Sequence, residues 1–310
     1  MSQLRVIAGV KLSYGKKLFL LAIPFMIYVF VFSYLPLYGW VYAFFDYKPG
    51  IPLLENQFVG TRFFTDLFST SVARRETLRV LKNTFLISFL NLLTAPIPVL
   101  FAIFLSEMRF PRARRLIQTV TTLPNFISWV LVYSVFYSIF ALDDGFFNRL
   151  GSVLIPSWQA YNPISDRHVV WQFQTIVTLW KTLGWNAIIY LAAITSIDQE
   201  QYDAAKVDGA SRIQTIWHIT VPGILPTFFV LLLLQVSNIV NNGLEQYFMF
   251  QNPMTKSSIE VLDLYVYNQG IANIYYSSAT AISVMKSLVS VTLLFLVNTL
   301  SKAVRGNSIF

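Results

Sequence analysis

The side chains that could do chemistry in this chain of 310 residues are few, and they favour binding over catalysis. There are no cysteines, and the two histidines, His168 and His218, have no neighbours at metal-ligand spacing. The loop that cradles ATP phosphates is missing, because Gly15-Lys16-Lys17 lacks the upstream glycine and the following Ser or Thr. No nucleophile motif occurs either. We therefore expect no catalytic residue, no metal site and no cofactor on this chain.

A second set of polar residues lies inside strongly apolar stretches, where polar groups are costly and usually face a cavity. Lys181 could bind a uronate carboxylate, pair with an acid, or extend its ammonium to the membrane surface. The amides at 235, 238 and 242 are three and four residues apart, a spacing that predicts one helix face. Amides bond sugar hydroxyls and aromatic rings stack on sugar faces, although interhelical hydrogen bonding is the alternative role. The candidates for a substrate pathway are Lys181, Trp185, Asn186, Gln235, Asn238, Asn242, Glu245 and Tyr247.

The segment 198–222 has the pattern of a short amphipathic helix. Asp198 and Gln201 form a capping-box pattern, so we expect a new helix to begin there. Residues 202, 205, 209, 213 and 216 recur every three or four positions and would form one face of it. The small side chains at 204–205 and 209–210 let another protein approach closely, whereas a lipid-binding helix would carry bulky apolar residues. Glycine costs about 1 kcal/mol in a helix relative to alanine, so Gly209 indicates close approach or a bend. Pro222 suits a chain that bends into the next helix.

Composition places the rest of the chain in a membrane. Hydrophobic residues make up 55% of the chain and charged residues 12%, against about 25% charged in an average soluble domain. A helix needs about 20 apolar residues to cross a bilayer. Six stretches qualify: 18–45, 84–105, 116–140, 170–197, 219–240 and 280–300. The first is too long for a cleaved signal peptide and indicates a retained anchor. We expect an all-α, polytopic membrane protein with one transmembrane domain, residues 1–310.

The distribution of Lys and Arg sets the predicted orientation. A net charge of +8 could indicate nucleic-acid binding in a soluble protein, but here it fits the positive-inside rule. The short turn at 109–115 holds four arginines and resists translocation, whereas the long segment 46–82 can cross. We therefore expect both termini, residues 1–17 and residues 198–218 in the cytoplasm, and 46–82 outside. Residues 63–81 of that external segment could form a helix on the outer face, either solvated or in contact with an external partner.

Residues 203–222 resemble the conserved cytoplasmic loop of binding-protein-dependent ABC importer permeases. That motif reads Glu-Ala-Ala, three residues, Gly, nine residues, Ile, one residue, Leu-Pro. At the same spacing this chain has Asp203-Ala204-Ala205, Gly209, Ile219 and Val221-Pro222, with Asp in place of Glu and Val in place of Leu. In the family the loop forms coupling helices that sit in a cleft of the ATPase subunit. The resemblance implies that the ATPase-coupling residues are Asp203, Ala204, Ala205, Gly209, Ile219 and Pro222. We call residues 198–222 the coupling segment.

Further stretches extend the resemblance over nearly the whole chain. Asn83-Thr84 and residues 108–111 are similar to the same superfamily, and residues 32–39, 46–50 and 180–186 resemble a carbohydrate-importer branch. Members of that branch work beside a lipoprotein-type or soluble solute-binding protein. They take up oligosaccharides, often derived from plant cell-wall or algal polysaccharides, and some of these substrates are acidic.

The resemblance implies a type I ABC importer permease fold in a bacterial cytoplasmic membrane. The implied partners are a second, related permease, two ATPase subunits that carry ATP and Mg, an extracytoplasmic solute-binding protein, the oligosaccharide and membrane lipid, but no nucleic acid. ATP would drive alternating access around a central site. The alternative is an ion-coupled secondary transporter, which should carry intramembrane Asp or Glu and internal repeats; neither is clear here. The missing catalytic motifs disfavour a membrane enzyme.

Overall fold

The first predicted span is an unusually exposed apolar stretch. The computed structural model describes residues 14–305, so the predicted N-terminal segment 1–17 lies outside the described residues except where the first helix begins. The stretch comprises α1 (Tyr14–Val29), the π-helical turn η1 (Phe30–Tyr34) and the 3-10 helix η2 (Leu35–Phe44). Together these form a 31-residue candidate span, which confirms the predicted span 18–45. None of the α1 side chains is buried, and η2 packs against the last helix.

The second span begins earlier than its hydropathy indicates. After η3 (Leu53–Glu55) and α2 (Arg62–Ser69), α3 (Ser71–Leu93) and α4 (Pro96–Ser106) form a candidate span of 36 residues. Residues 71–82, predicted as part of a separate external segment, are therefore the first turns of α3. The charged residues in these turns lower their hydropathy, so they were not predicted as part of the span. One of these charges is paired inside the protein: Arg79 Nη2 lies 2.7 Å from the buried Glu260 carboxylate. Next to it, Asn83 Nδ2 donates to the Ser257 and Glu260 carbonyls.

The third predicted span, 116–140, is not one straight helix. The continuous stretch of α5 (Pro111–Thr122) and η4 (Leu123–Phe126) is followed by α6 (Trp129–Phe140), which is turned by 109°. Pro124 starts η4, and the Ser128 hydroxyl caps α6 by accepting a hydrogen bond from the Leu131 amide. Hydropathy reports length and composition but not direction, so it joined the two helices into one span. A further helix, α7 (Phe146–Leu154), follows α6.

The remaining three predicted spans are confirmed. They are α8 (Val170–Thr195), the stretch Arg212–Ser237, and α15 (Tyr276–Arg305). α9 (Gln199–Val207) precedes the second of these, which consists of α10 (Arg212–Thr215), the π-helical turn η5 (Ile216–Thr220) and α11 (Val221–Ser237). Before α15 come α12 (Glu245–Phe250), α13 (Lys256–Ile259), α14 (Leu262–Tyr267) and η6 (Asn268–Ala272). The described residues thus hold five candidate spans, or six if the bent pair counts as one.

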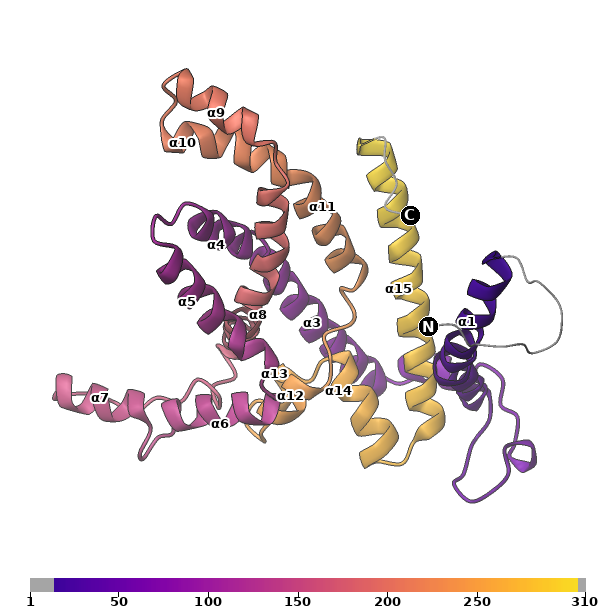
Figure 1. The fold of residues 1–310 in the computed structure, drawn as a ribbon. Helices are drawn as coiled ribbons and strands as arrows, with labels where there is room; N and C mark the ends of the chain where they lie inside the picture. The colour runs from indigo at the N-terminus through magenta and orange to yellow at the C-terminus, as the bar shows by residue number, and fades with distance from the viewer. Residues whose placement is uncertain (1–13, 306–310) are drawn as a thin grey trace, which may run out of the picture.

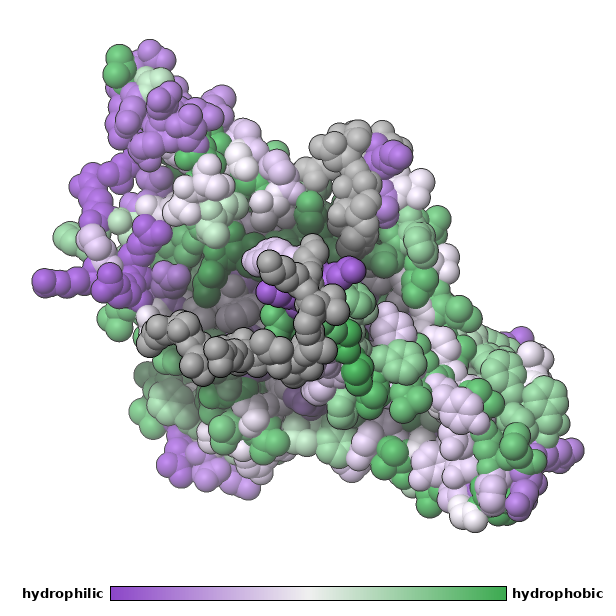
Figure 2. All heavy atoms as spheres, turned by 45° about the vertical axis from the view of Figure 1, so that its right-hand side comes forward, coloured by the Kyte–Doolittle hydropathy of each residue, from purple (hydrophilic) through white to green (hydrophobic). Residues whose placement is uncertain are grey.

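The helices divide the molecule into two ends and an apolar middle. In Figure 1, α9 and α10 stand at one end, and α6, α7, α12 and α14 lie at the other. Figure 2 shows hydrophilic side chains gathered at the α9–α10 end, while hydrophobic side chains cover much of the surface below. One buried cluster joins α3, α6, α8 and α12–α14, and a second joins α4, α8 and α11. At Gly184, α8 approaches α5 so closely that a Cβ would collide with the Thr121 carbonyl.

Candidate functional site

The coupling segment folds as two short helices whose starts are fixed by side chains. α9 begins after Asp198, whose carboxylate accepts a hydrogen bond of 3.0 Å from the Glu200 amide, so the predicted N-cap is confirmed. α10 begins after Ser211, which forms a reciprocal capping box with Gln214. The Ser-x-x-Gln pattern of this second cap is visible in the sequence but was not used to predict a helix start.

Gly209 separates the two helices. Its φ is +72°, in the left-handed region that costs an L side chain about 1–2 kcal/mol. The amides of Ala210 and Gly209 donate to the carbonyls of Ala205 and Lys206 at 2.9 and 3.1 Å, the paired bonds of a Schellman motif that ends α9. The prediction of one helix face through 202, 205, 209, 213 and 216 is therefore wrong, because the chain turns at Gly209. Apart from its two chain neighbours, no described residue of 14–305 has an atom within 4 Å of a Cβ built there, so the backbone angle accounts for the glycine.

One side-chain contact attaches α9 to the start of the long helix α11, and the short link before α9 packs on the same helix. The Tyr202 hydroxyl lies 3.1 Å from the Thr220 hydroxyl, just before α11. Ile197, in the link between α8 and α9, packs so tightly on Gly223 of α11 that a Cβ there would collide with it. α9 is therefore in contact with the base of α11 and joined to α8 through a link that is itself packed on α11.

Most of the coupling residues implied by the motif are accessible. Asp203 and Ala204 are exposed, Ala205 and Ile219 are half-buried, and Pro222 is exposed in the first turn of α11. The expected bend at Pro222 is absent, because the helical stretch runs on from Arg212 to Ser237. The hydrogen bond and charge of Lys206, at 2.8 Å, hold the pKa of the Asp203 carboxyl below its usual value. Val207 and Trp217, which the spacing did not single out, are 87% and 64% exposed. Small, charged and exposed apolar groups together form a surface suited to a protein partner.

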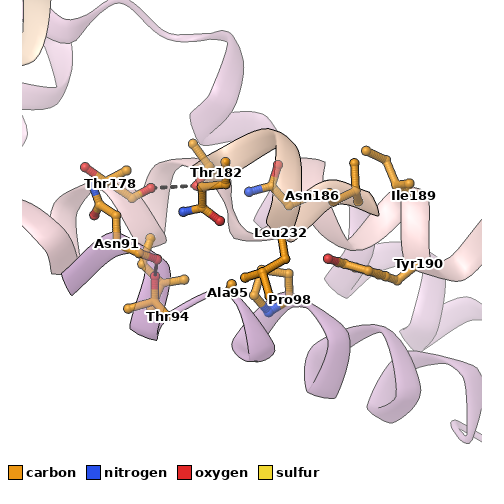
Figure 3. A pocket seen from close by; sticks show the side chains of 13 residues that line it. Asn91, Thr94, Ala95, Pro98, Thr178, Thr182, Asn186, Ile189, Tyr190 and Leu232 are labelled. Atoms are coloured by element: carbon orange, nitrogen blue, oxygen red, sulfur yellow. Dashed lines mark hydrogen bonds between the residues drawn. The ribbon is translucent and has the colours of Figure 1, made fainter. Parts of the chain in front are cut away.

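A cavity of about 360 Å³ lies between α3–α4, α8 and α11 (Figure 3). Its polar lining is neutral, made of amides and hydroxyls alone, and apolar side chains complete the wall. The break between α3 and α4 at Thr94 brings backbone and small side chains to one wall, while α8 supplies residues one turn apart. The Thr182 hydroxyl donates to the Thr178 carbonyl, which leaves its oxygen lone pairs as acceptors. The polar lining residues are Asn91, Thr94, Thr178, Thr182, Asn186, Tyr190 and Gln235.

Of the predicted pathway residues, Asn186 and Gln235 line this cavity. α11 ends at Ser237, so Asn238 and Asn242 are not on the predicted helix face with Gln235. Asn238 Nδ2 donates to the Leu234 carbonyl and Asn242 Nδ2 to the Ser88 hydroxyl. Interhelical hydrogen bonding, the alternative role for the amides, describes Asn242, whose partner Ser88 lies on α3, whereas Asn238 bonds the end of its own helix.

The other predicted residues also lie outside the cavity lining. Tyr247 is buried, near the side chains of Asn91 and Asn242. Glu245 is exposed at the α6–α12 junction, beside Trp129. Trp185 is 46% exposed and packs edge-on against Phe126, with 5.7 Å between ring centroids.

Lys181 has a structural partner rather than a place in the cavity lining. Its side chain is buried, and Nζ donates to the carbonyls of Pro124, Asn125 and Ile127 at 2.9, 3.1 and 2.5 Å. These three carbonyls lie at the break between α5–η4 and α6, and the ammonium also stands 5.2 Å from the centre of the Trp129 ring. All three ammonium protons are thus engaged. Binding of a carboxylate, pairing with an acid and extension to the membrane surface do not describe this geometry.

The sequence reasoning missed five of the polar lining residues: Asn91, Thr94, Thr178, Thr182 and Tyr190. The spacing held the signal, since Thr178, Thr182 and Asn186 recur every four residues along one face of α8.

Comparison with known proteins shows that this chain is similar to transport proteins. Residues 95–306 match the family model described as binding-protein-dependent transport system inner membrane component. Protein LplB of Bacillus subtilis (strain 168) is 36% identical over 95% of this chain and 91% of its own length. The polygalacturonan/rhamnogalacturonan transport system permease protein YteP of the same strain is 35% identical over 94% of this chain and 90% of its own.

Two solved structures share the fold. One is of a bacterial ABC transporter involved in the import of the acidic polysaccharide alginate; its matching chain has a TM-score of 0.83 and 29% identity, over 94% of this chain and 96% of that chain. The other is the bacterial alginate ABC transporter in complex with its alginate pentasaccharide-bound periplasmic protein, with the same score and identity over 95% and 96%.

Proposed function

Because the chain belongs to the family of binding-protein-dependent transport system inner membrane components, we propose that its cavity and its coupling segment act together in the import of an oligosaccharide. The chain is a permease of a sugar ABC importer with the all-α permease fold. The ion-coupled alternative has no support among its relatives. We therefore propose which of its residues contact the substrate and which contact the ATPase.

The observation that carries the proposal is that α8 and α11 belong to both sites. Each lines the cavity, through Thr182 and Asn186 on α8 and Gln235 on α11. Each also adjoins α9: α8 through the short link that holds Ile197, which packs on Gly223, and α11 through the contact of Tyr202 with Thr220 just before its start. Asn186 is nine residues from the end of α8, or about 14 Å along a helix. A force applied at α9 therefore has a short, rigid route to the cavity, as alternating access requires.

The lining of the cavity favours hydroxyl groups over charge. Amides and threonine hydroxyls bond sugar hydroxyls, and none of the lining residues is ionised. YteP is named for polygalacturonan, and the matching structures are of an alginate importer, so acidic sugars are substrates among proteins similar to this one. We infer an oligosaccharide whose hydroxyls this chain contacts, with no charge selection by its cavity.

The expected partners follow from the functions proposed for the cavity and for the coupling segment. A second permease would complete the pathway, and two ATPase subunits carrying ATP and Mg would receive α9 and α10. An extracytoplasmic binding protein would deliver substrate, as in the alginate complex, where a periplasmic protein holds a pentasaccharide. Arg109 between α4 and α5, with Arg112, Arg114 and Arg115 in the first turns of α5, supports a cytoplasmic position for this turn, and we propose the same side for the coupling segment and both termini in a bacterium.

Uptake by the assembled transporter in proteoliposomes tests the cavity. Thr182→Val keeps the shape and removes the hydroxyl, and we expect the half-saturating concentration to rise roughly fivefold, because one hydrogen bond contributes about 1 kcal/mol. The loss should be equal for acidic and neutral oligosaccharides, and ATPase binding should be unchanged. The matched control is Thr292→Val on the exposed face of α15, whose hydroxyl also bonds only its own helix. Equal uptake by the two variants would refute the role of the cavity.

A further inference from the structure

α6 and α7 form an arm that extends sideways from the bundle. α6 leaves the α5–η4 stretch at 109°, and Figure 1 shows α6 and α7 reaching sideways past the other helices. They lie at the level where α3 and α15 begin, away from α9 and α10. In the orientation proposed above, this is the outer boundary of the membrane. The arm therefore runs along the bilayer surface rather than through it.

One side of α7 is closed by its own following loop. Asn148 Nδ2 donates to the Ala141 and Tyr161 carbonyls, and its Oδ1 accepts from the Tyr161 amide and Trp158 Nε1. Gly151 packs against the Trp158 ring so closely that a Cβ would collide with it. These contacts fix how α7 is rotated about its axis.

The other side of α7 is apolar and bare. Phe146, Leu150, Val153 and Leu154 are 67%, 45%, 80% and 68% exposed and are spaced at i, i+4, i+7 and i+8, one helix face. The helix carries no acid, and its one charge, Arg149, borders the bare face.

The occupant of this face follows from its side chains and its place. Helix faces that pack on other membrane helices favour small residues, whereas this face presents bulky ones, as helices that lie in the bilayer interface do. α6 of the same arm also exposes apolar side chains, among them Val130 and Leu131. We propose that α7 is an in-plane membrane anchor, whose bare face inserts among the acyl chains and headgroups of the outer leaflet.

The assembled transporter allows a direct test, because the chain has no cysteine to remove. A nitroxide is attached at Val153→Cys or Ser152→Cys, and its collisions with oxygen, which concentrates in lipid, and with a water-soluble nickel complex are measured in vesicles. Ser152 is the matched control, because it is exposed and lies about 100° around the helix from Val153, outside the apolar face. Leu154→Cys repeats the test if the label at Val153 disturbs assembly.

We expect the oxygen-to-nickel collision ratio to be severalfold higher at Val153→Cys than at Ser152→Cys. Ready access of the nickel complex to both positions would mean that the face is solvated, and the anchor would be refuted. Shielding of Val153→Cys from both reagents would mean that a protein, the second permease or the binding protein, covers α7. That outcome would also overturn the proposal. Neither result bears on the import function itself.

Discussion

Substitution of Gly209 tests whether backbone geometry or close packing requires this glycine. With φ at +72° and no atom near the Cβ position, Gly209→Ala adds only the left-handed penalty, about 1 kcal/mol. Gly209→Asn should cost less, because asparagine enters this region more readily, and Gly209→Val more, because it is β-branched. A change of about 1 kcal/mol shifts the equilibrium between the closed and frayed end of α9 roughly fivefold.

Hydrogen exchange over residues 203–213 measures that equilibrium, because the amides at 209 and 210 donate the two bonds that end α9. We expect exchange to quicken in the order Gly, Asn, Ala, Val, and binding of the ATPase to weaken in the same order. Gly209→Trp, which adds bulk to strain, should leave insertion intact but lose the ATPase. Gly39→Ala is the control, since Gly39 has open space and ordinary φ. Weaker ATPase binding by Gly209→Asn than by Gly209→Ala would show that size matters, and the reasoning from φ would be refuted.

Two further substitutions probe the links made by α8 and α9. Lys181→Met should lower the free energy of unfolding by about 3 kcal/mol, because three backbone carbonyls lose their donor, and should reduce uptake of acidic and neutral oligosaccharides alike. Thermal unfolding and uptake assays measure these effects, and a selective loss of the acidic substrate would show that the ammonium binds it. Tyr202→Phe removes the bond to Thr220 and should lower transport per ATP hydrolysed without weakening ATPase binding. An unchanged ratio in proteoliposomes would contradict the linkage.

The sequence predicts the membrane class and most spans because apolar length is a property of composition. Prediction from the sequence fails where the structure depends on the direction of a helix or on a backbone angle. The charges of 74–82 conceal the start of α3, since their internal pairing, such as Arg79 with Glu260, depends on residues far along the chain. The turn between α5 and α6 has the same origin, because the three carbonyls at the break find their donor in Lys181, more than fifty residues away.

In the candidate site too, features set by neighbouring residues could be predicted from the sequence, and features set by distant contacts could not. Local caps such as Asp198 are readable, because a cap and its partner are neighbours in sequence. The helix face assigned to 235, 238 and 242 is wrong because α11 stops at Ser237, and periodicity does not report where a helix ends. The cavity itself forms only when the α3–α4 break meets α8, which no single segment contains.

The hydrogen bonds of Lys181 on α8 restrict how the turn at 124–127 can move. The turn at 124–127 cannot move independently of α8 unless a buried ammonium and three carbonyls are left without partners, a change that costs several kcal/mol. Ile197, just past the end of the same 26-residue helix, packs on Gly223 beside the coupling segment. Lys181 lies 14 residues from that end, or about 21 Å along the helix. Because one continuous helix carries both contacts, we expect a movement of α9 and α10 to be accompanied by a movement of the turn at 124–127, and the reverse.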